Sequence, residues 1–191
     1  STIKPAIGMY GLSNNIVNWD FEMKDPGFFT LPETGRIFRG WLKGGHGKVN
    51  MHKAFLVSSN TYFFSLAYEA DIRELSKHLL NLGFGQKVCL DCFDEDQVFV
   101  PTPEWKYNIM NKGWVKGDTV NLGIGQGYLV ATPMQLANYA SILATKGQFI
   151  EPSIVILDNQ KKSIKTWQDE RFDDADWSKM HQALLGVIES D

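Results

Sequence analysis

Apolar residues recur every three or four positions along much of the chain, and this spacing predicts a mainly helical protein. The first helix is expected over residues 1 to about 14, with an apolar side made of Ile3, Ala6, Ile7, Met9, Tyr10 and Leu12. Asn50 has the side chain of a helix cap and is expected to begin a second helix. Residues 61–67 are so apolar that we expect them to form a buried helix.

Capping signals predict where later helices begin. Asp71 and Glu74 match a capping box, a pair of side chains that bind the free N–H groups in the first turn of a helix. Thr102 and Thr132 each precede a proline, which is favoured at the first helical position, so helices are expected after both.

Three stretches depart from the helical pattern. Residues 19–49 are rich in glycine, proline and aromatic residues without sustained periodicity, which predicts a long irregular excursion with short strands at most. Residues 117–128 are glycine-rich but lack the Lys-Ser/Thr step of a nucleotide-binding loop, which favours a tight backbone turn. A hairpin is expected from residues 153–157 and 163–167, followed by a last helix over about 175–189.

Composition narrows the class of protein. The chain has 191 residues, of which 43% are hydrophobic, and a net charge of −3, which suits one globular domain with a sizeable core. The absence of a basic run argues against nucleic acid as a partner. No apolar run is long enough to cross a membrane, and no signal peptide is recognised. Because the chain opens on a candidate nucleophile, we expect it to be an excised piece.

The two cysteines, Cys89 and Cys92, are too few for a disulfide framework. A zinc knuckle would need two further ligands, and no second cysteine pair exists. A redox pair favours the start of a helix, whereas Cys92 is followed by the acidic residues 94–96. We therefore expect two incidental cysteines.

Candidate chemistry begins with Ser1 and Lys4. Residues three apart lie on one side of a helix, so the Ser1 hydroxyl and the Lys4 amine can meet. Lys4 can accept the proton of a serine nucleophile only if burial or a nearby cation lowers its pKa. Ser58 and Asn60, at a junction between helices, could relay a proton and hold a substrate amide. Either motif alone is also typical of ordinary helix starts and caps.

Together the two motifs follow the order found in the serine penicillin-recognising enzymes, S-x-x-K and then S-x-N. Further stretches resemble one family, the class B elongation-type transpeptidase domain of penicillin-binding protein 2. The matching stretches are Ser1-Thr2-Ile3-Lys4-Pro5, Asp25-Pro26-Gly27, Gly45-His46-Gly47, residues 117–128 and Ala131-Thr132-Pro133. The Gly-Ile-Gly-Gln-Gly-Tyr run of residues 123–128 is the most specific of them.

The resemblance implies an α/β fold of the penicillin-binding protein transpeptidase and serine β-lactamase type. Residues 1–191 would be a partial transpeptidase domain: the mainly helical portion, with part of the sheet missing. The family's third motif, K-[ST]-G, is absent from this chain and is expected beyond residue 191.

The implied activity is peptidoglycan D,D-transpeptidation. By resemblance, Ser1 would be acylated by the D-Ala-D-Ala end of a stem peptide or by a β-lactam. Lys4 would be the general base, Ser58 the proton relay and Asn60 the substrate-binding amide. The implied partners are peptidoglycan stem peptides, β-lactam antibiotics, a membrane glycosyltransferase and other elongation-complex proteins. The implied location is the periplasmic face of the bacterial inner membrane, with an anchoring helix that this chain lacks.

No cofactor and no metal are expected. Some relatives hold zinc in the excursion before the second motif, and the matching positions here are Asp25, Gly40, His46 and Ser59. Two of these four have no ligand side chain for tetrahedral zinc.

Other activities remain open at this point. A serine β-lactamase or D,D-carboxypeptidase would share both motifs, and a β-lactam sensor would keep Ser1 without turnover. An N-terminal-nucleophile hydrolase is opposed by the helical pattern. If the sheet is missing, Ile3, Ile7 and Tyr10 should be exposed to water, and the isolated chain should acylate negligibly.

Overall fold

The computed structural model describes residues 2–89, 91–92, 95–96, 98–154, 164–167 and 169–189. Its helices are α1 (Lys4–Ser13), α2 (Met51–Leu56), α3 (Asn60–Glu69), α4 (Ile72–Asn81), α5 (Pro103–Met110), α6 (Lys116–Leu122), α7 (Pro133–Ala144) and α8 (Asp174–Glu189). Its strands are β1 (Met23–Asp25), β2 (Phe28–Thr30), β3 (Ile37–Arg39), β4 (Gly47–Val49), β5 (Gln148–Ile150) and β6 (Ile164–Thr166). Helix therefore dominates, as the sequence pattern predicts.

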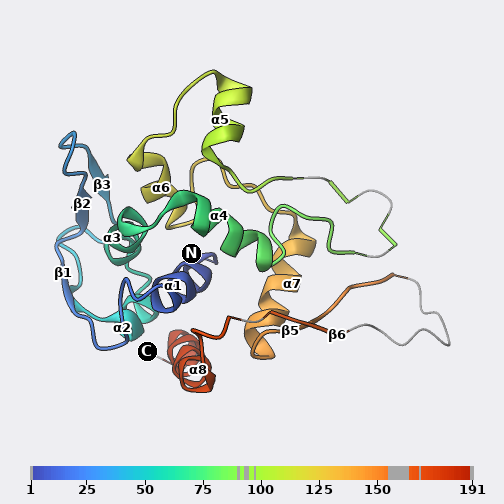
Figure 1. Ribbon diagram of the computed structural model, residues 1–191. Helices are drawn as coiled ribbons and strands as arrows, with labels where there is room; N and C mark the ends of the chain where they lie inside the picture. Colours follow the sequence, from blue (N-terminus) through green and yellow to red (C-terminus); the bar gives the residue numbers. More distant parts are fainter. Residues whose placement is uncertain are drawn as a thin grey trace.

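Helix α1 lies at the centre of the molecule (Figure 1) and contacts α2, α3 and α4. Every residue from Lys4 to Ser13 is buried. Gly8 and Gly11 allow this close packing: a Cβ atom on Gly8 would lie 2.7 Å from the Phe55 ring, and one on Gly11 would lie 2.7 Å from Leu66. The two glycines bring side chains of α2 and α3 against the backbone of α1.

The expectation that Ile3, Ile7 and Tyr10 face water is wrong. Their exposed fractions are 4%, 0% and 4%. Other elements of the same chain cover them: the Ile3 side chain occupies the space beside Gly125, and the Tyr10 ring packs edge-on against His78. Large apolar side chains are exposed elsewhere, on α8, where Leu185, Val187 and Ile188 face outward.

Most predicted helix starts are confirmed. Asn50 Oδ1 accepts a hydrogen bond from the Lys53 N–H, Thr102 Oγ1 accepts one from the Trp105 N–H, and Thr132 forms a complete capping box with its partner three residues on. Asp71 caps α4, but the predicted reciprocal bond to Glu74 is not formed, and the Glu74 carboxylate accepts from Lys77 Nζ.

The glycine-rich stretch is only partly the predicted loop. Its first part forms α6, in whose first turn the Asp118 carboxylate accepts the Val115 N–H and places a favourable negative charge at the start of the helix. A turn then follows, with Gly125 and Gly127 at positive φ angles of 75° and 86°.

The excursion between α1 and α2 contains two small antiparallel pairs, β1 with β4 and β2 with β3. In the third pair, β5 lies against β6, with Gln148 opposite Thr166 and Phe149 opposite Lys165. The hairpin strand predicted at 153–157 is therefore placed wrongly, since residues 148–150 pair with β6; residues 155–163 lie outside the described part.

The prediction of two incidental cysteines is also wrong. Cys89 and Cys92 form a disulfide, with Cα atoms 5.5 Å apart. Between them Asp91 accepts hydrogen bonds from the Ser153 hydroxyl and the Ile154 N–H, both at 2.8 Å. The short distance between the two Cα atoms satisfies disulfide geometry, which sequence spacing alone does not reveal.

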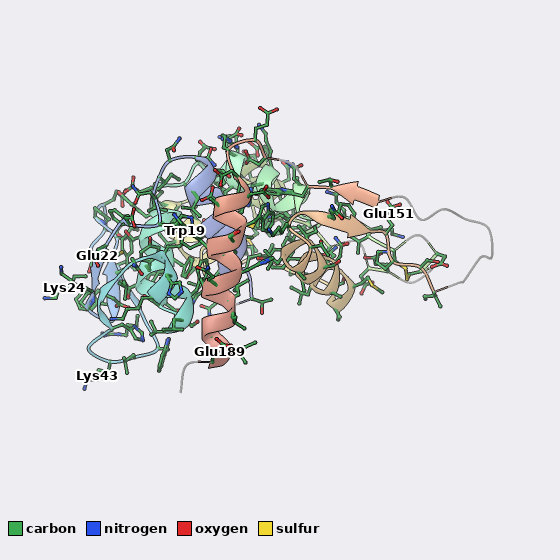
Figure 2. The ribbon with its side chains drawn as sticks, turned by 90° about the horizontal axis from the view of Figure 1, so that it is seen from below. Trp19, Glu22, Lys24, Lys43, Glu151 and Glu189 are labelled. Atoms are coloured by element: carbon green, nitrogen blue, oxygen red, sulfur yellow. A yellow bond between two sulfur atoms is a disulfide. The ribbon has the colours of Figure 1, made fainter. Side chains whose placement is uncertain are left out.

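Helix α8 is joined to the excursion after α1 by Trp19, which lies beside α8 in Figure 2 and donates from its indole nitrogen to Asp176. Within the described ranges, no helix is long and apolar enough to cross a membrane.

Candidate active site

The structure brings together three of the four predicted site residues. Lys4 Nζ donates to the Ser58 carbonyl oxygen at 2.8 Å, to Ser58 Oγ at 2.9 Å and to Asn60 Oδ1 at 2.7 Å. Ser1, the predicted nucleophile, lies outside the described residues. The two motifs, more than fifty residues apart in sequence, thus meet at one amine.

Burial gives the Lys4 amine an unusual protonation equilibrium. The residue is 2% exposed, and its Nζ lies 5.5 Å from the centre of the Phe63 ring. Burial penalises the charged ammonium and lowers the pKa of Lys4 to about 8. At pH 7 roughly one molecule in ten then carries a neutral amine, whereas almost none would at the ordinary lysine pKa. A neutral amine can accept a proton.

The turn between α2 and α3 aims two side chains at Lys4. Ser58 has a positive φ of 49°, a left-handed conformation that side-chain-bearing residues seldom adopt. Ser59, the residue between the two predicted ones, caps α3 by accepting the Tyr62 N–H at 3.2 Å. The capping role that S-x-N stretches often serve therefore falls to Ser59, while Ser58 and Asn60 contact Lys4.

A cavity of about 510 Å³ lies beside Lys4, within the size range of ligand-binding pockets. Its lining consists of Thr2, Lys4, Pro5, Phe55, Ser58, Tyr139, Ala140, Leu143, Leu184 and Val187. Lys4 and Ser58 thus line an otherwise largely apolar cavity, which combines a place for a substrate with a group that can move a proton.

Three of the four positions matched to a zinc site are joined by direct contacts. His46 Nδ1 lies 2.8 Å from Asp25 Oδ2, Ser59 Oγ donates to the same oxygen at 2.6 Å, and the Gly27 N–H donates to Asp25 Oδ1 at 2.7 Å. The fourth position, Gly40, is linked to them through Gly27, whose carbonyl oxygen accepts the Gly40 N–H.

This donor set does not fit tetrahedral zinc. Only one carboxylate and one imidazole are present, where zinc prefers four ligands, and protein donors already bind both oxygens of the carboxylate. Within the described ranges, the group that could hold a metal is Cys89, Asp91 and Cys92, and its two sulfurs are joined in the disulfide. That no metal is bound remains a prediction.

Comparison with known proteins decides the family. The sequence matches the penicillin binding protein transpeptidase domain over residues 1–191. The chain belongs to this transpeptidase family. Its fold is accordingly that of a penicillin-binding protein transpeptidase domain, of which the described residues form a mixed helical and sheet part.

Two curated relatives and two solved structures illustrate the similarity. Peptidoglycan D,D-transpeptidase MrdA of Acinetobacter baumannii is 40% identical over 196 residues, covering all of this chain and 29% of that protein. MrdA of Escherichia coli K12 is 32% identical over 190 residues, covering all of this chain and 28% of that protein. The chain therefore spans less than a third of these relatives.

The solved structures agree in fold with the transpeptidase family. Pseudomonas aeruginosa PBP2 in complex with WCK 5153 superimposes with a TM-score of 0.85 at 35% identity, covering 96% of this chain and 42% of that one. PBP2 of Helicobacter pylori gives a TM-score of 0.83 at 33% identity, covering 98% of this chain and 33% of that one.

Sequence analysis gave no role at Lys4 to several residues that shape its surroundings. Phe63 and Tyr139 line or adjoin the Lys4 environment, and Asp25 and Trp41 contact the turn that carries Ser58. Their apolar or loop character gave no chemical signal. The Asp25-Pro26-Gly27 stretch was recognised only through the family resemblance. Its hydrogen bond from Ser59 to the Asp25 carboxylate was not predicted.

Proposed function

We propose that this chain carries the acylation machinery of a peptidoglycan D,D-transpeptidase that cross-links stem peptides. The observation that carries the proposal is the contact of one buried amine, Lys4 Nζ, with both Ser58 Oγ and Asn60 Oδ1. The two curated relatives described above are peptidoglycan D,D-transpeptidases, which supports the same reaction.

In the proposed reaction, Ser1 Oγ attacks the carbonyl carbon between the two terminal D-alanines. Neutral Lys4 takes the hydroxyl proton, and the tetrahedral intermediate then expels the amine of the last D-alanine. Ser58 Oγ would pass a proton to that leaving amine, and its distance of 2.9 Å from Lys4 Nζ supports this relay. D-Alanine departs, and an ester joins the stem peptide to Ser1.

The second half-reaction restores the serine. The amine of a neighbouring stem peptide attacks the ester carbonyl, loses a proton to the Ser58 and Lys4 relay, and forms the new peptide bond while Ser1 Oγ regains its proton. Hydrolysis by water instead of this amine would make the protein a carboxypeptidase, so the acceptor in the second step defines a transpeptidase.

Asn60 is proposed to bind the substrate backbone. Its Oδ1 already accepts from Lys4, which leaves the Nδ2 group as the donor for a substrate carbonyl. A β-lactam would use the same contacts, and the related Pseudomonas aeruginosa PBP2 was solved in complex with WCK 5153.

We infer that the protein acts at the periplasmic face of the inner membrane with a membrane glycosyltransferase and other elongation proteins. The related Helicobacter pylori PBP2 was solved in complex with MreC, which supports partners of this kind.

The test is covalent labelling of a protein that carries this chain within a complete transpeptidase domain. Mass spectrometry after incubation with a β-lactam should show one adduct, on Ser1, and no adduct in Ser1→Ala. A D-Ala-D-Ala peptide with an added acceptor amine should then yield the cross-linked product in excess over the hydrolysed one. An adduct on another residue would contradict the site, and hydrolysis alone would contradict transpeptidation.

A further inference from the structure

The α2–α3 turn holds Ser58 in a left-handed conformation that the local sequence does not favour. The turn must nevertheless place two side-chain atoms within hydrogen-bonding distance of one lysine. A backbone conformation of this kind persists only where surrounding contacts hold it. Two residues of the excursion between α1 and α2 make such contacts.

Asp25, at the end of β1, holds the turn from inside. Its Oδ2 accepts the Ser59 hydroxyl at 2.6 Å, and both residues are buried. Burial alone would raise the pKa of Asp25, but hydrogen bonds from Ser59, His46 and the Gly27 N–H lower it below the ordinary value, so the acceptor is an anion. Hydrogen bonds to an ionised acceptor are shorter and stronger than neutral ones.

Trp41 holds the turn from outside. Its indole Nε1 lies 3.1 Å from the Val57 carbonyl oxygen and 3.2 Å from that of Ser58, and donates to both. The Ser58 carbonyl is the same one that accepts from Lys4 Nζ. The Trp41 ring is 62% exposed and packs against His46, with ring centres 5.2 Å apart.

His46 joins the two contacts. Its Nδ1 faces the Asp25 carboxylate, and its ring supports the Trp41 indole. One continuous set of contacts therefore runs from Asp25 through His46 to Trp41 and encloses the turn, with Ser59 bound at one end and Ser58 at the other.

We propose that Asp25 and Trp41 are positioning residues for acylation, which hold Ser58 and Asn60 against Lys4 through hydrogen bonds alone, without a metal ion. The inference rests on the proposed function. A misplacement of about 1 Å at a reacting group can cost about a hundredfold in rate, so loss of the buried contact should reach the chemistry. Trp41, being exposed, contributes less.

The test compares three variants in a complete transpeptidase domain that carries this chain. Asp25→Asn keeps the shape but removes the charged acceptor for Ser59, and Trp41→Phe keeps the ring but removes the indole donor. Asp20→Asn, an exposed aspartate five residues earlier, is the matched control. The rate of acylation by a fluorescent penicillin is measured per folded molecule, from pH 6 to pH 10.

We expect Asp25→Asn to slow acylation by about ten- to a hundredfold, Trp41→Phe by about three- to tenfold and Asp20→Asn by less than twofold. The rate should rise with pH through the Lys4 pKa, and its midpoint should lie higher in Asp25→Asn, because a loosened turn admits water to the ammonium. A residue that only stabilises the fold would lower the folded fraction and leave this midpoint in place.

Several outcomes would overturn the inference. One is that Asp25→Asn is acylated at a rate within twofold of the unaltered protein and that the midpoint of its pH dependence is unchanged. If that variant does not fold, the exposed Trp41→Phe variant provides the test. An unchanged rate of acylation in Trp41→Phe would then overturn the inference. Loss of activity of the unaltered protein in 1,10-phenanthroline, restored by zinc, would show that a metal holds the turn. An unaltered protein that is not acylated at all would overturn the proposed function as well.

Discussion

Two long connections between helices, residues 14–50 and the described part of residues 82–102, are held by different means. In the first, buried Asp25 binds Ser59, and Trp41 binds the Ser58 carbonyl, so its contacts end on the turn that faces Lys4. In the second connection, a disulfide joins Cys89 to Cys92. The Glu95 carboxylate accepts the Cys89 N–H of the same segment, and the Asp91 carboxylate accepts from residues 153–154.

This difference predicts whether a substitution in each segment also affects the turn that contacts Lys4. The buried hydrogen bond between Asp25 and Ser59 should transmit movement to the turn that contacts Lys4, because neither partner can be replaced by water without cost. A disulfide four residues wide closes a small loop upon itself, so its loss should loosen that loop and little else. Substitutions in the first segment should therefore lower the rate of acylation, whereas substitutions in the second should loosen only the local structure.

The largest effect is expected at Lys4, the residue that the turn contacts. Lys4→Ala should slow acylation at least about a hundredfold, in line with general-base effects. The melting temperature should change little, because three lost hydrogen bonds are offset by relief of a buried ammonium. Lys77→Ala, an exposed lysine of α4, is the control for losing a positive charge. Normal acylation with a large loss of stability would make Lys4 structural.

A neighbouring pair of glycines tests whether the excursion transmits movement. A Cβ atom on Gly45 would lie 2.1 Å from the Asp25 carbonyl oxygen, whereas one on Gly44 would meet nothing within 4 Å. Both have positive φ angles, 74° at Gly45 and 92° at Gly44, so alanine strains the backbone at either position.

Gly45→Ala should therefore lower the free energy of unfolding by about 1–3 kcal/mol more than Gly44→Ala. It should also slow acylation, since β1 and the Asp25 carboxylate must shift. Chemical denaturation and fluorescent penicillin labelling measure the two effects. Equal losses in the two variants would mean that backbone strain alone matters and that contact with Asp25 does not.

The sequence predicted this site better than its surroundings. The sequence sufficed to predict that Ser58 and Asn60 lie near Lys4. The spacing of Ser1 and Lys4 on a helix and the order of the two motifs can both be read without knowing how distant segments pack. Helix caps such as Asn50 and Thr132 were predictable for the same reason. The Lys4 contacts are borne out, while the catalytic roles remain proposals and Ser1 lies outside the described residues.

Features that depend on distant packing could not be predicted. Ile7 is buried by segments far along the chain, and no local pattern tells which of them will cover it. The partner of β6 was misplaced because residues 148–150 and 153–157 are both acceptable strands by composition. Helix α6 was missed because Gly117 and the glycines that follow the helix suggested a loop, and only the Asp118 cap reveals the helix.

In the second segment, replacing Cys89 and Cys92 by serine should have a smaller effect. The closure of so short a loop contributes about 2 kcal/mol at most by the chain-entropy relation. Hydrogen exchange should become faster at the Cys89 and Ile154 amides, which now donate to Glu95 and Asp91. Acylation should stay within twofold of the unaltered protein. A tenfold fall in acylation would show that this loop, too, is coupled to the active site.

The smallest expected effect is that of removing metal. Within the part of the chain that the structure describes, the buried Nε2 of His46 has no hydrogen-bond partner, and such an atom could in principle bind zinc. A zinc ion there would still find only Asp25 as a second strong ligand, and that carboxylate already accepts from Ser59 and Gly27. Elemental analysis of protein purified without added metal should therefore give well under one zinc per chain, and chelation should leave both acylation and the melting temperature unchanged. Stoichiometric zinc that disappears in His46→Ala would contradict this, and would mean that the first segment is held to the active-site turn by a metal after all.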